Sequence, residues 1–179
     1  MKTKGNLLLA AVIGGAFMAI AGTAEAIDLR SWDSQINNPG RFKVLSDFND
    51  AAVLDKETQL VWEQSPDTGK RTWFDALSHC YQREVGTRLG SRKGWRLPTI
   101  EELASLVDPN NPNGNPDLPP GHPFSNVQSS SYWSATTLAT QTGNAWLVSL
   151  INGLVLNDDK PFTNFVWCVR GGQGIDGVQ

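Results

Sequence analysis

Apolar and polar residues in the first half of the chain follow a pattern that predicts two short strands and then a helix. Residues 51–64, AAVLDKETQLVWEQ, hold two apolar runs on either side of a polar turn, which is typical of paired strands. Over 72–85, apolar residues recur at helical spacing, at Trp73, Leu77, Cys80 and Tyr81. Thr72 and Asp75 supply a capping-box-like start. This helix is therefore expected to direct Cys80 into the domain.

The stretch GWRLPTIEEL, residues 94–103, is predicted to be a structural joint rather than an active site. Pro98 disfavours helix at the residue before it. Thr99, with Glu102 three residues later, forms a capping box. A second helix is therefore expected to begin here and to run to about Val107.

Tryptophan and arginine side chains are expected to stabilise this joint and the core. Trp95 and Arg96 precede the cap and are expected to lock the loop that enters the helix, with Arg96 paired to a carboxylate. The chain has seven tryptophans, and each buries much area while its N–H needs a partner. Most are expected in the core, including those in predicted strands: Trp133, Trp146 and Trp167. The alternative is that exposed tryptophans stack on sugar rings, with Trp32 the one most expected to be exposed.

The second half of the chain predicts a long loop followed by antiparallel strands. Residues 108–124 contain six prolines and four asparagines, so a pinned surface loop is expected. Asn152-Gly153 signals a type I′ hairpin. Residues 164–170 alternate as in a strand, with Val166, Cys168 and Arg170 on one face and Phe165, Trp167 and Val169 on the other. Strands are predicted within 131–137, 144–150, 154–157 and 164–170.

The N-terminus predicts an export signal. Lys2 and Lys4 precede an apolar run over 7–22, and Ala24-Glu25-Ala26 forms a small-x-small cleavage site. The protein is therefore expected in the periplasm or outside the cell, and a retained membrane anchor is the less favoured alternative. The expected organisation is a signal peptide at 1–26, an arm at 27–41, one domain at 42–172 and a flexible tail at 173–179.

Composition narrows the class of protein further. The 179 residues include 15 basic and 18 acidic ones. Removing 1–26 takes away Lys2, Lys4 and Glu25, which leaves 153 residues with 13 basic, 17 acidic and a formal charge of −4. This length suits one domain, and the acidic balance disfavours a nucleic-acid-binding protein. The two cysteines, Cys80 and Cys168, favour a disulfide in an exported protein; two buried free thiols are the alternative.

Six segments in order resemble the Lcl C-terminal domain family, named from a bacterial collagen-like adhesin: LDKETQLVWEQ, TWFDALSHC, GWRLPTIEELASLVD, YWSATT, AWLVSLINGLV and VWCVRGG. The resemblance covers about residues 42–172. It implies an α+β, C-type-lectin-like fold, with two helices on a mainly antiparallel twisted sheet and a disulfide from a helix to the last strand. It also implies recognition of sulfated polysaccharide, with no cofactor. The namesake's collagen-like Gly-X-Y run is missing from this chain.

A second similarity raises an enzymatic alternative. WRLPTIEEL with the closing VRGG is similar to the formylglycine-generating enzyme superfamily, which includes oxidases with reactive cysteines close together in the C-terminal region. Here the cysteines lie far apart in sequence, and fold similarity does not carry chemistry. Nucleophilic catalysis by Cys80 with His79 would need a free thiol, and no serine-hydrolase, zinc-protease or P-loop motif occurs. A non-enzymatic protein is therefore expected.

A basic cluster directly before the joint is the main candidate binding site. Residues 83–96 hold five basic side chains and one acid, Glu84, in an otherwise acidic protein. The planar fork of arginine matches sulfate and carboxylate groups. Four side chains are predicted to bind an anionic or sulfated polysaccharide: Arg83, Arg88, Arg92 and Lys93. The alternative for this cluster is a solvated loop paired with acidic residues. The alternative function is a protein-binding or structural envelope factor that uses the Pro-rich loop or the N-terminal arm.

The Pro/Asn-rich loop carries a calcium alternative. Asp108-Pro109-Asn110 and Asn115-Pro116-Asp117 resemble the tripeptides with which C-type lectins hold calcium and sugar. Calcium takes about six to eight oxygen ligands. Acid-Pro-Asn also recurs as turn chemistry, so a metal site is the less favoured interpretation. Its candidate carboxylates, provided that they fold close together, are Asp108, Asp117, Asp158 and Asp159.

Overall fold

The structure, a computed structural model, describes residues 40–86, 92–108, 111 and 116–171. These residues belong to one compact unit, Gln35–Gln179. No helix in these ranges is long and apolar enough to cross a membrane. Several predicted features lie outside the described residues: the signal peptide, nearly all of the arm with Trp32, the tail, and Arg88.

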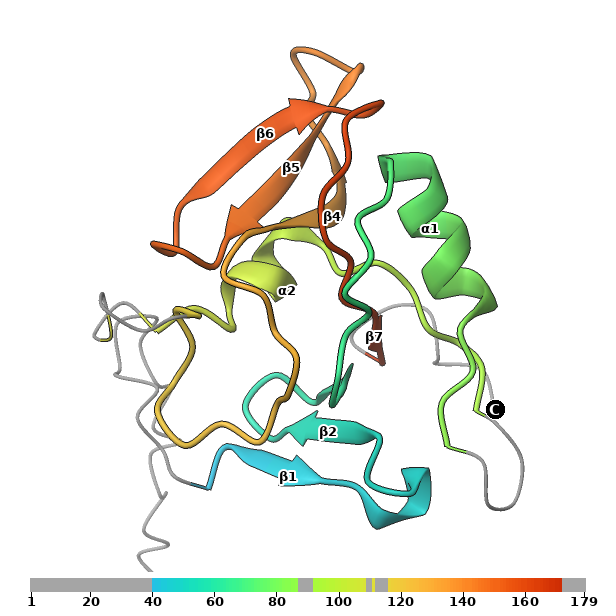
Figure 1. Cartoon of the computed structure of the whole chain (residues 1–179), viewed down its shortest axis with the longest axis vertical. Helices are drawn as coiled ribbons and strands as arrows, with labels where there is room; N and C mark the ends of the chain where they lie inside the picture. Colours follow the sequence, from blue (N-terminus) through green and yellow to red (C-terminus); the bar gives the residue numbers. More distant parts are fainter. Residues whose placement is uncertain (1–39, 87–91, 109–110, 112–115, 172–179) are drawn as a thin grey trace, which may run out of the picture. The chain divides into compact units, whose positions relative to one another are not determined.

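Two antiparallel sheets form the framework (Figure 1). The first has the order β1-β2-β3-β7, built from Phe42–Val44, Ala52–Asp55, Leu60–Glu63 and Val169–Arg170. The second has the order β4-β5-β6, built from Ser131–Thr137, Asn144–Ser149 and Val155–Asp159. The strand pair predicted within 51–64 is therefore confirmed as β2 and β3. Together with two helices, these sheets confirm the predicted α+β class.

The first sheet is anchored by a buried ion pair that the sequence did not reveal. Arg41, assigned by sequence to the loose arm, is only 1% exposed. Its Nε and Nη2 donate to the two carboxylate oxygens of Asp55 at 3.0 and 2.7 Å, and Nη2 also donates to the Ser105 carbonyl at 2.9 Å. The ordered domain thus begins before Phe42, because this pair ties the start of β1 to β2 and to the end of the second helix.

Two helices, α1 (Trp73–Gln82) and α2 (Ile100–Ala104), contact the second sheet. The Thr72 hydroxyl accepts a hydrogen bond from the Asp75 N–H at 3.3 Å, which confirms the predicted cap of α1. The capping box of α2 is complete, because Thr99 Oγ1 accepts from the Glu102 N–H at 3.3 Å and the Glu102 carboxylate accepts from the Thr99 N–H at 2.8 Å.

The helix α2 is shorter than predicted, ending at Ala104 instead of near Val107. The Ser105 N–H still bonds to the Glu101 carbonyl, four residues back. The N–H groups of Leu106 and Val107 instead bond to carbonyls three residues back, of Leu103 and Ala104. Such bonds tighten the last turn and satisfy carbonyls that would otherwise lack partners. Leu103 and Leu106 are fully buried all the same, as expected for the face that packs inward.

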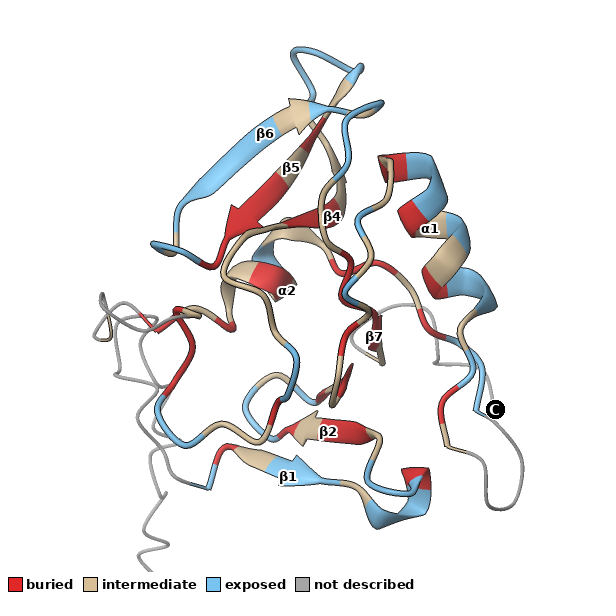
Figure 2. Ribbon diagram, in the orientation of Figure 1, coloured by how far each residue is buried: buried red, intermediate tan, exposed pale blue. Residues whose placement is uncertain are grey.

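Buried aromatic side chains fill the core, as predicted. Figure 2 shows burial concentrated on β4 and β5, on one side of α1 and beside β7, whereas β6 is exposed. Trp146 is half-buried. The other five described tryptophans are buried: Trp62, Trp73, Trp95, Trp133 and Trp167. All of these except Trp62 donate the ring N–H to a backbone carbonyl.

The alternation over 164–170 separates two cores rather than core from solvent. Only Val169–Arg170 form a strand, β7, and residues 166–169 are all buried. Val166 and Cys168 belong to one cluster of buried side chains, whereas Trp167 and Val169 belong to the other. Core therefore lies on both sides of this segment, and the strand predicted over 164–170 is shortened to Val169–Arg170.

The helix α1 faces the core with a different set of residues from the one predicted. Trp73, Ala76 and Cys80 are buried, and Leu77 is partly buried against the same cluster. Tyr81, which the periodicity assigned to the buried face, is 82% exposed. Adjacent helical residues diverge by about 100°, so the inward position of Cys80 turns Tyr81 out.

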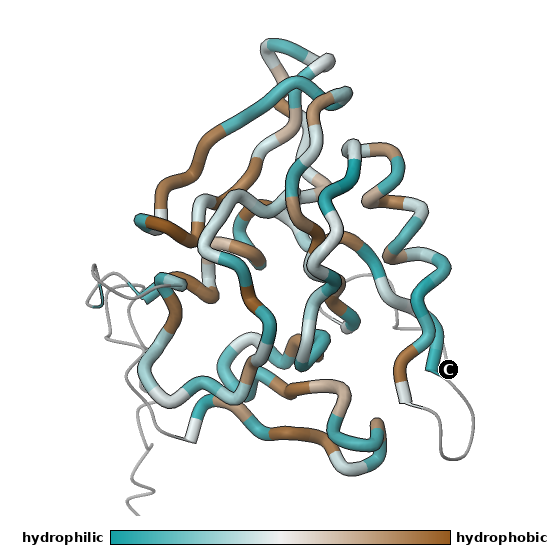
Figure 3. The backbone as a smooth tube through the Cα atoms, viewed as in Figure 1, coloured by the Kyte–Doolittle hydropathy of each residue, from teal (hydrophilic) through white to brown (hydrophobic). Residues whose placement is uncertain are grey.

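The β5–β6 hairpin is present, but its turn is longer than the predicted type I′. The Ser149 N–H donates to the Leu154 carbonyl at 2.9 Å and encloses four residues, 150–153. Gly153 has a φ of +69° whereas Asn152 does not have a positive φ, and type I′ needs positive φ at both central residues. Figure 3 shows an apolar stretch at this end of the hairpin, where Ile151 and Leu154 are 59% and 52% exposed.

Candidate functional site

The Cys80–Cys168 disulfide joins α1 to the segment before β7, as predicted. Its Cα atoms lie 5.4 Å apart, it spans 88 residues of sequence, and both cysteines are fully buried. Since these are the chain's two cysteines, neither offers a thiol in this state. The disulfide therefore leaves Cys80 without the free thiol that a nucleophile paired with His79 would need.

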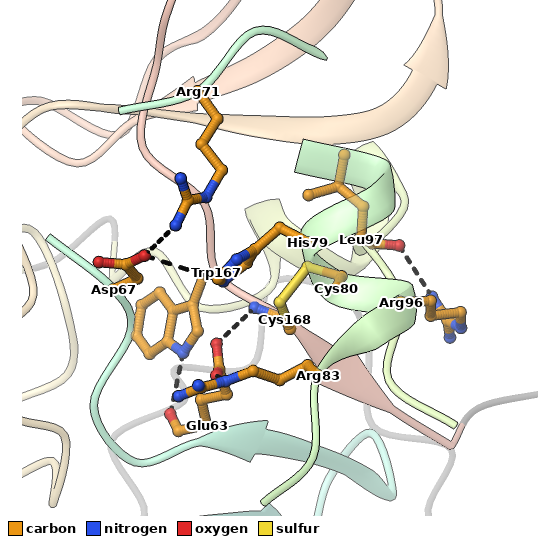
Figure 4. Close-up of a disulfide and its surroundings, with 10 residues drawn as sticks. All are labelled: Glu63, Asp67, Arg71, His79, Cys80, Arg83, Arg96, Leu97, Trp167 and Cys168. Atoms are coloured by element: carbon orange, nitrogen blue, oxygen red, sulfur yellow. Dashed lines mark hydrogen bonds and ion pairs between the residues drawn. A yellow bond between two sulfur atoms is a disulfide. The ribbon is translucent and has the colours of Figure 1, made fainter. Parts of the chain in front are cut away.

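A buried carboxylate, Glu63, lies beside the disulfide at the end of β3 (Figure 4). Its side chain is 1% exposed. Oε2 accepts a hydrogen bond from the Cys168 N–H at 3.0 Å, and Oε1 accepts one from Nε of Arg83. Burial raises the pKa of Glu63 above its ordinary 4.5, although the Arg83 charge and the Cys168 N–H both oppose that rise. Arg83 is thus the counter-ion of a carboxylate that has lost most of its water.

A second polar group lies on the same side of the disulfide. Nη2 of Arg71 donates to Oδ2 of Asp67, and Nε2 of His79 lies 4.0 Å from that oxygen. The Gly69 N–H, with the Arg71 charge, lowers the pKa of Asp67 despite partial burial. Burial and then the Arg71 charge lower the pKa of His79 below 6.5. At neutral pH the group is therefore an Arg–Asp ion pair next to a neutral imidazole.

The described side chains of the predicted basic cluster each contact a different partner. Arg83 pairs with Glu63, as above, and 37% of its side chain is exposed. The Arg92 guanidinium lies 4.9 Å from the centre of the Phe48 ring, and Lys93 lies 3.0 Å from Glu84 with 77% of its side chain exposed. The cluster is therefore less positive than its sequence suggests, because Glu63 of β3 neutralises Arg83 and Glu84 of the same stretch pairs with Lys93.

Arg83 also lines a surface pocket of about 300 Å³. Its wall is formed by seven residues: Ala51, Gln64, Ser65, Arg83, Glu84, Val85 and Gly86. Gly86 has a φ of +86°, and a Cβ there would come within 3.0 Å of the Phe48 Cα, so a side chain at this position would strain the wall. The contact with Glu63 uses Nε of Arg83 and not its two Nη nitrogens. The pocket thus presents an oriented guanidinium with amide and hydroxyl groups around it.

The predicted joint has the contacts expected of it. The Arg96 guanidinium donates to both carboxylate oxygens of Glu102 at 2.7 Å and to the Gly171 carbonyl at 2.7 Å. Burial acts to raise the pKa of Glu102, but the Arg96 hydrogen bonds and the Thr99 N–H outweigh it and lower that pKa. Trp95 is 1% exposed. The Arg96–Glu102 pairing is thus confirmed, and it connects the start of α2 to the end of β7.

The four calcium candidates divide into two separate pairs. Asp108 and Asp117 are buried, and burial together with the Asp108 charge raises the pKa of Asp117. The Asp117 N–H donates to the Leu150 carbonyl at the turn of the β5–β6 hairpin. Asp158 and Asp159 pair with the opposite end of β5, about 15 Å or more along the strand. The condition on which the calcium alternative depended, that all four carboxylates fold close together, is not met, and no cluster of three metal-ligating side chains occurs among the described residues.

Sequence reasoning identified Arg83 as a candidate but not Glu63, the carboxylate that holds its guanidinium. Glu63 and Arg83 lie 20 residues apart on a strand and beyond the end of a helix, so no local spacing connects them. The usable signal was the acid that ends the apolar run of β3, at a position where an apolar residue is expected. Its burial requires a partner, because an isolated buried carboxylate is unfavourable.

Comparison with known proteins adds one relationship. Residues 51–170 match the family model described as the Lcl C-terminal domain. This range contains the disulfide, the joint and the whole lining of the Arg83 pocket. No curated protein matches the chain.

Proposed function

Because the chain belongs to the Lcl C-terminal domain family, we propose that it is an exported, non-enzymatic recognition module that binds anionic or sulfated polysaccharide in an adhesin-like way. The family resemblance supplies the ligand class. The proposal extends to a C-type-lectin-like fold, which is supported by the two antiparallel sheets and by the disulfide between α1 and the residue directly before β7.

The observation that carries this proposal is the geometry of Arg83. Its Nε is held by buried Glu63, which is itself held by the Cys168 N–H. A guanidinium fixed in this way loses little side-chain freedom when it binds a ligand, and its remaining nitrogens suit the oxygens of a sulfate or carboxylate. The pocket adds Ser65, whose hydroxyl accepts from Asn126 and keeps its own proton to donate, and Gln64, whose amide already bonds to the Pro123 carbonyl and to Ser125.

Lys93 and Arg92 support the same ligand class. Lys93 is exposed and its partner Glu84 is 40% exposed, so the pair is screened by water and contributes little stability. A polymeric anion can therefore compete with Glu84 for the ammonium. Arg92 lies over the Phe48 ring. The backbone of Phe48 lies beside Gly86, which forms part of the pocket wall. Arg88, the fourth predicted member, lies outside the described residues.

The test is titration with heparin-like oligosaccharides at two salt concentrations. We expect wild-type binding that weakens as salt rises. Arg83→Lys keeps the charge but loses the planar fork, so it should weaken binding roughly tenfold. Lys56→Gln removes an exposed charge from the β2–β3 turn and serves as the matched control, with affinity unchanged. Absence of salt-sensitive binding by the wild type would show that the proposal is wrong.

Export is tested separately, by N-terminal sequencing of the protein from a producing cell. Cleavage by signal peptidase after Ala26 predicts a mature chain that begins at Ile27. The mature protein should be recovered from the periplasm or the medium. A chain that keeps Met1 and stays in the cytoplasm would contradict this part of the proposal.

A second candidate function, binding of an envelope protein, is favoured by the β5–β6 hairpin. Four aliphatic side chains at the turn and on β6 are more than two-fifths exposed: Ile151, Leu154, Val155 and Leu156. β6 is also the edge of its sheet, and exposed apolar edge strands are sites of pairing with other chains. A stoichiometric protein captured from envelope extracts, and lost with Leu154→Ser/Leu156→Ser, would favour this function over glycan binding.

A further inference from the structure

The solvent-facing side of α1 carries two exposed aromatic rings in a row. Phe74 is 63% exposed and Tyr81 is 82% exposed, and the residue between them on the same side, Ser78, is small and exposed. Seven residues along an α-helix return within about 20° of the same direction and advance about 10 Å. We name Phe74, Ser78 and Tyr81 the aromatic face.

Core packing does not account for the aromatic face. The opposite side of α1 is the one that packs, through Trp73, Ala76 and Cys80, and Figures 1 and 2 show the exposed side turned away from both sheets. Phe74 contacts Trp73 edge-on at 5.2 Å between ring centres, which fixes its position on the helix. Exposed aromatic rings present apolar faces to a ligand at little cost in side-chain freedom.

The Tyr81 end of the aromatic face has an exposed cation, Lys93, which is paired with Glu84 at 3.0 Å and has 77% of its side chain exposed. Glu84 raises the pKa of Lys93, first through the hydrogen bond and then through its charge, and Tyr81 adds a smaller contribution in the same direction. Arg83 follows two residues after Tyr81. The Phe74 end instead carries Asp75, whose carboxylate accepts a hydrogen bond from the Thr72 hydroxyl at 2.7 Å. The charge along the helix is therefore asymmetric.

We propose that the aromatic face is a sugar-stacking surface, and that a linear anionic polysaccharide lies along α1 with its charged groups at the Tyr81 end and an uncharged ring on Phe74. Pyranose rings have apolar C–H faces that pack on aromatic rings, and the spacing of Phe74 and Tyr81 accommodates two sugars of one chain over Ser78. Lys93 complements sulfate or carboxylate at one end, whereas Asp75 repels it at the other. This inference rests on the proposed function, because the Arg83 pocket lies beyond the Tyr81 end.

The inference separates ring recognition from charge recognition, and the experiment does the same. Calorimetric titrations use two probes: a heparin-derived octasaccharide, and inorganic polyphosphate, which has charge but no rings. Phe74→Ala/Tyr81→Ala should weaken octasaccharide binding about tenfold and leave polyphosphate binding unchanged. Alanine is a good helix former at exposed positions, and far-ultraviolet circular dichroism checks that α1 remains.

The control variant is Ile151→Ala/Leu154→Ala, which removes exposed apolar side chains from the β5–β6 hairpin and should change neither affinity. Equal octasaccharide affinity for wild type and Phe74→Ala/Tyr81→Ala would overturn the inference and leave the proposed function standing. An equal loss of affinity for both probes would also overturn it, since stacking would not be the cause. If the wild type binds neither probe, the proposed function is wrong and the inference falls with it.

Discussion

The clearest test of the electrostatic structure is Arg83→Met, which removes the counter-ion of Glu63 and keeps much of the side chain's volume. The variant leaves a carboxylate that is 1% exposed with the Cys168 N–H as its remaining described partner. Removing one partner of a fully buried ion pair costs about 3–5 kcal/mol. Because 37% of the Arg83 side chain is exposed and water screens that part, we expect a loss of about 2 kcal/mol at pH 8.

The loss should depend on pH in a defined direction. Burial already raises the pKa of Glu63 above 4.5 in the folded protein, so its charged form destabilises the fold as pH rises. Without Arg83 that pKa rises further. Near pH 4 Glu63 is protonated in both proteins, and the two should have nearly the same stability. The difference should grow as pH increases through the folded pKa of the wild type.

The assay is urea unfolding followed by tryptophan fluorescence under non-reducing conditions, at pH 4 and pH 8. Glu63→Gln/Arg83→Met should be more stable than Arg83→Met at pH 8, because glutamine is uncharged and still accepts from Cys168. Lys93→Met breaks the exposed pair with Glu84 and is the matched control, with an unchanged midpoint. A loss that is equal at both pH values, or not relieved by Glu63→Gln, would refute the reasoning.

Three further predictions concern stability. Cys80→Ala/Cys168→Ala should lower the free energy of unfolding by about 4–5 kcal/mol, because the bridge closes an 88-residue separation; a loss below about 1 kcal/mol in urea titration would contradict this. Thr99→Ala should cost about 1 kcal/mol by removing one half of the capping box with octasaccharide affinity unchanged. Asp117→Asn should raise the thermal midpoint at pH 7 but not at pH 3, because burial and then Asp108 raise the pKa of Asp117 and charge there destabilises the fold above its ordinary 3.8. A midpoint that rises with added CaCl2 in the wild type alone would instead favour the calcium alternative.

Local chemistry explains which elements could be predicted from the sequence. The Thr72 and Thr99 caps, the β2–β3 pair and the β5–β6 hairpin depend on residues within a few positions of one another, and all are present. The same periodicity placed Cys80 correctly on the inward side of α1 but also placed the adjacent Tyr81 there, which is exposed. The disulfide settles which of the two faces inward, and it is a contact over 88 residues.

Long-range pairing explains what sequence reasoning missed at the candidate site. The basic residues of 83–96 could be counted, but their partners come from other elements: Glu63 from β3 for Arg83, and Phe48 from the turn before β2 for Arg92. The pocket exists because β3, the loop before β2 and the end of α1 meet. The alternation over 164–170 also could not reveal that residues 166–169 pack into core clusters on both of their sides.

The position of residues 166–169 between both core clusters bears on the order in which the chain can fold. The Trp167 ring bonds to the Glu63 carbonyl, 104 residues earlier, and Cys168 bonds across 105 residues to the Glu63 side chain. Neither cluster is complete until this late segment has been synthesised. Contacts of such separation slow folding, so we expect the growing chain to stay open until its last strand arrives. A chain that is still unfolded can also pass through a narrow channel. Docking of residues 166–169 then completes both core clusters together.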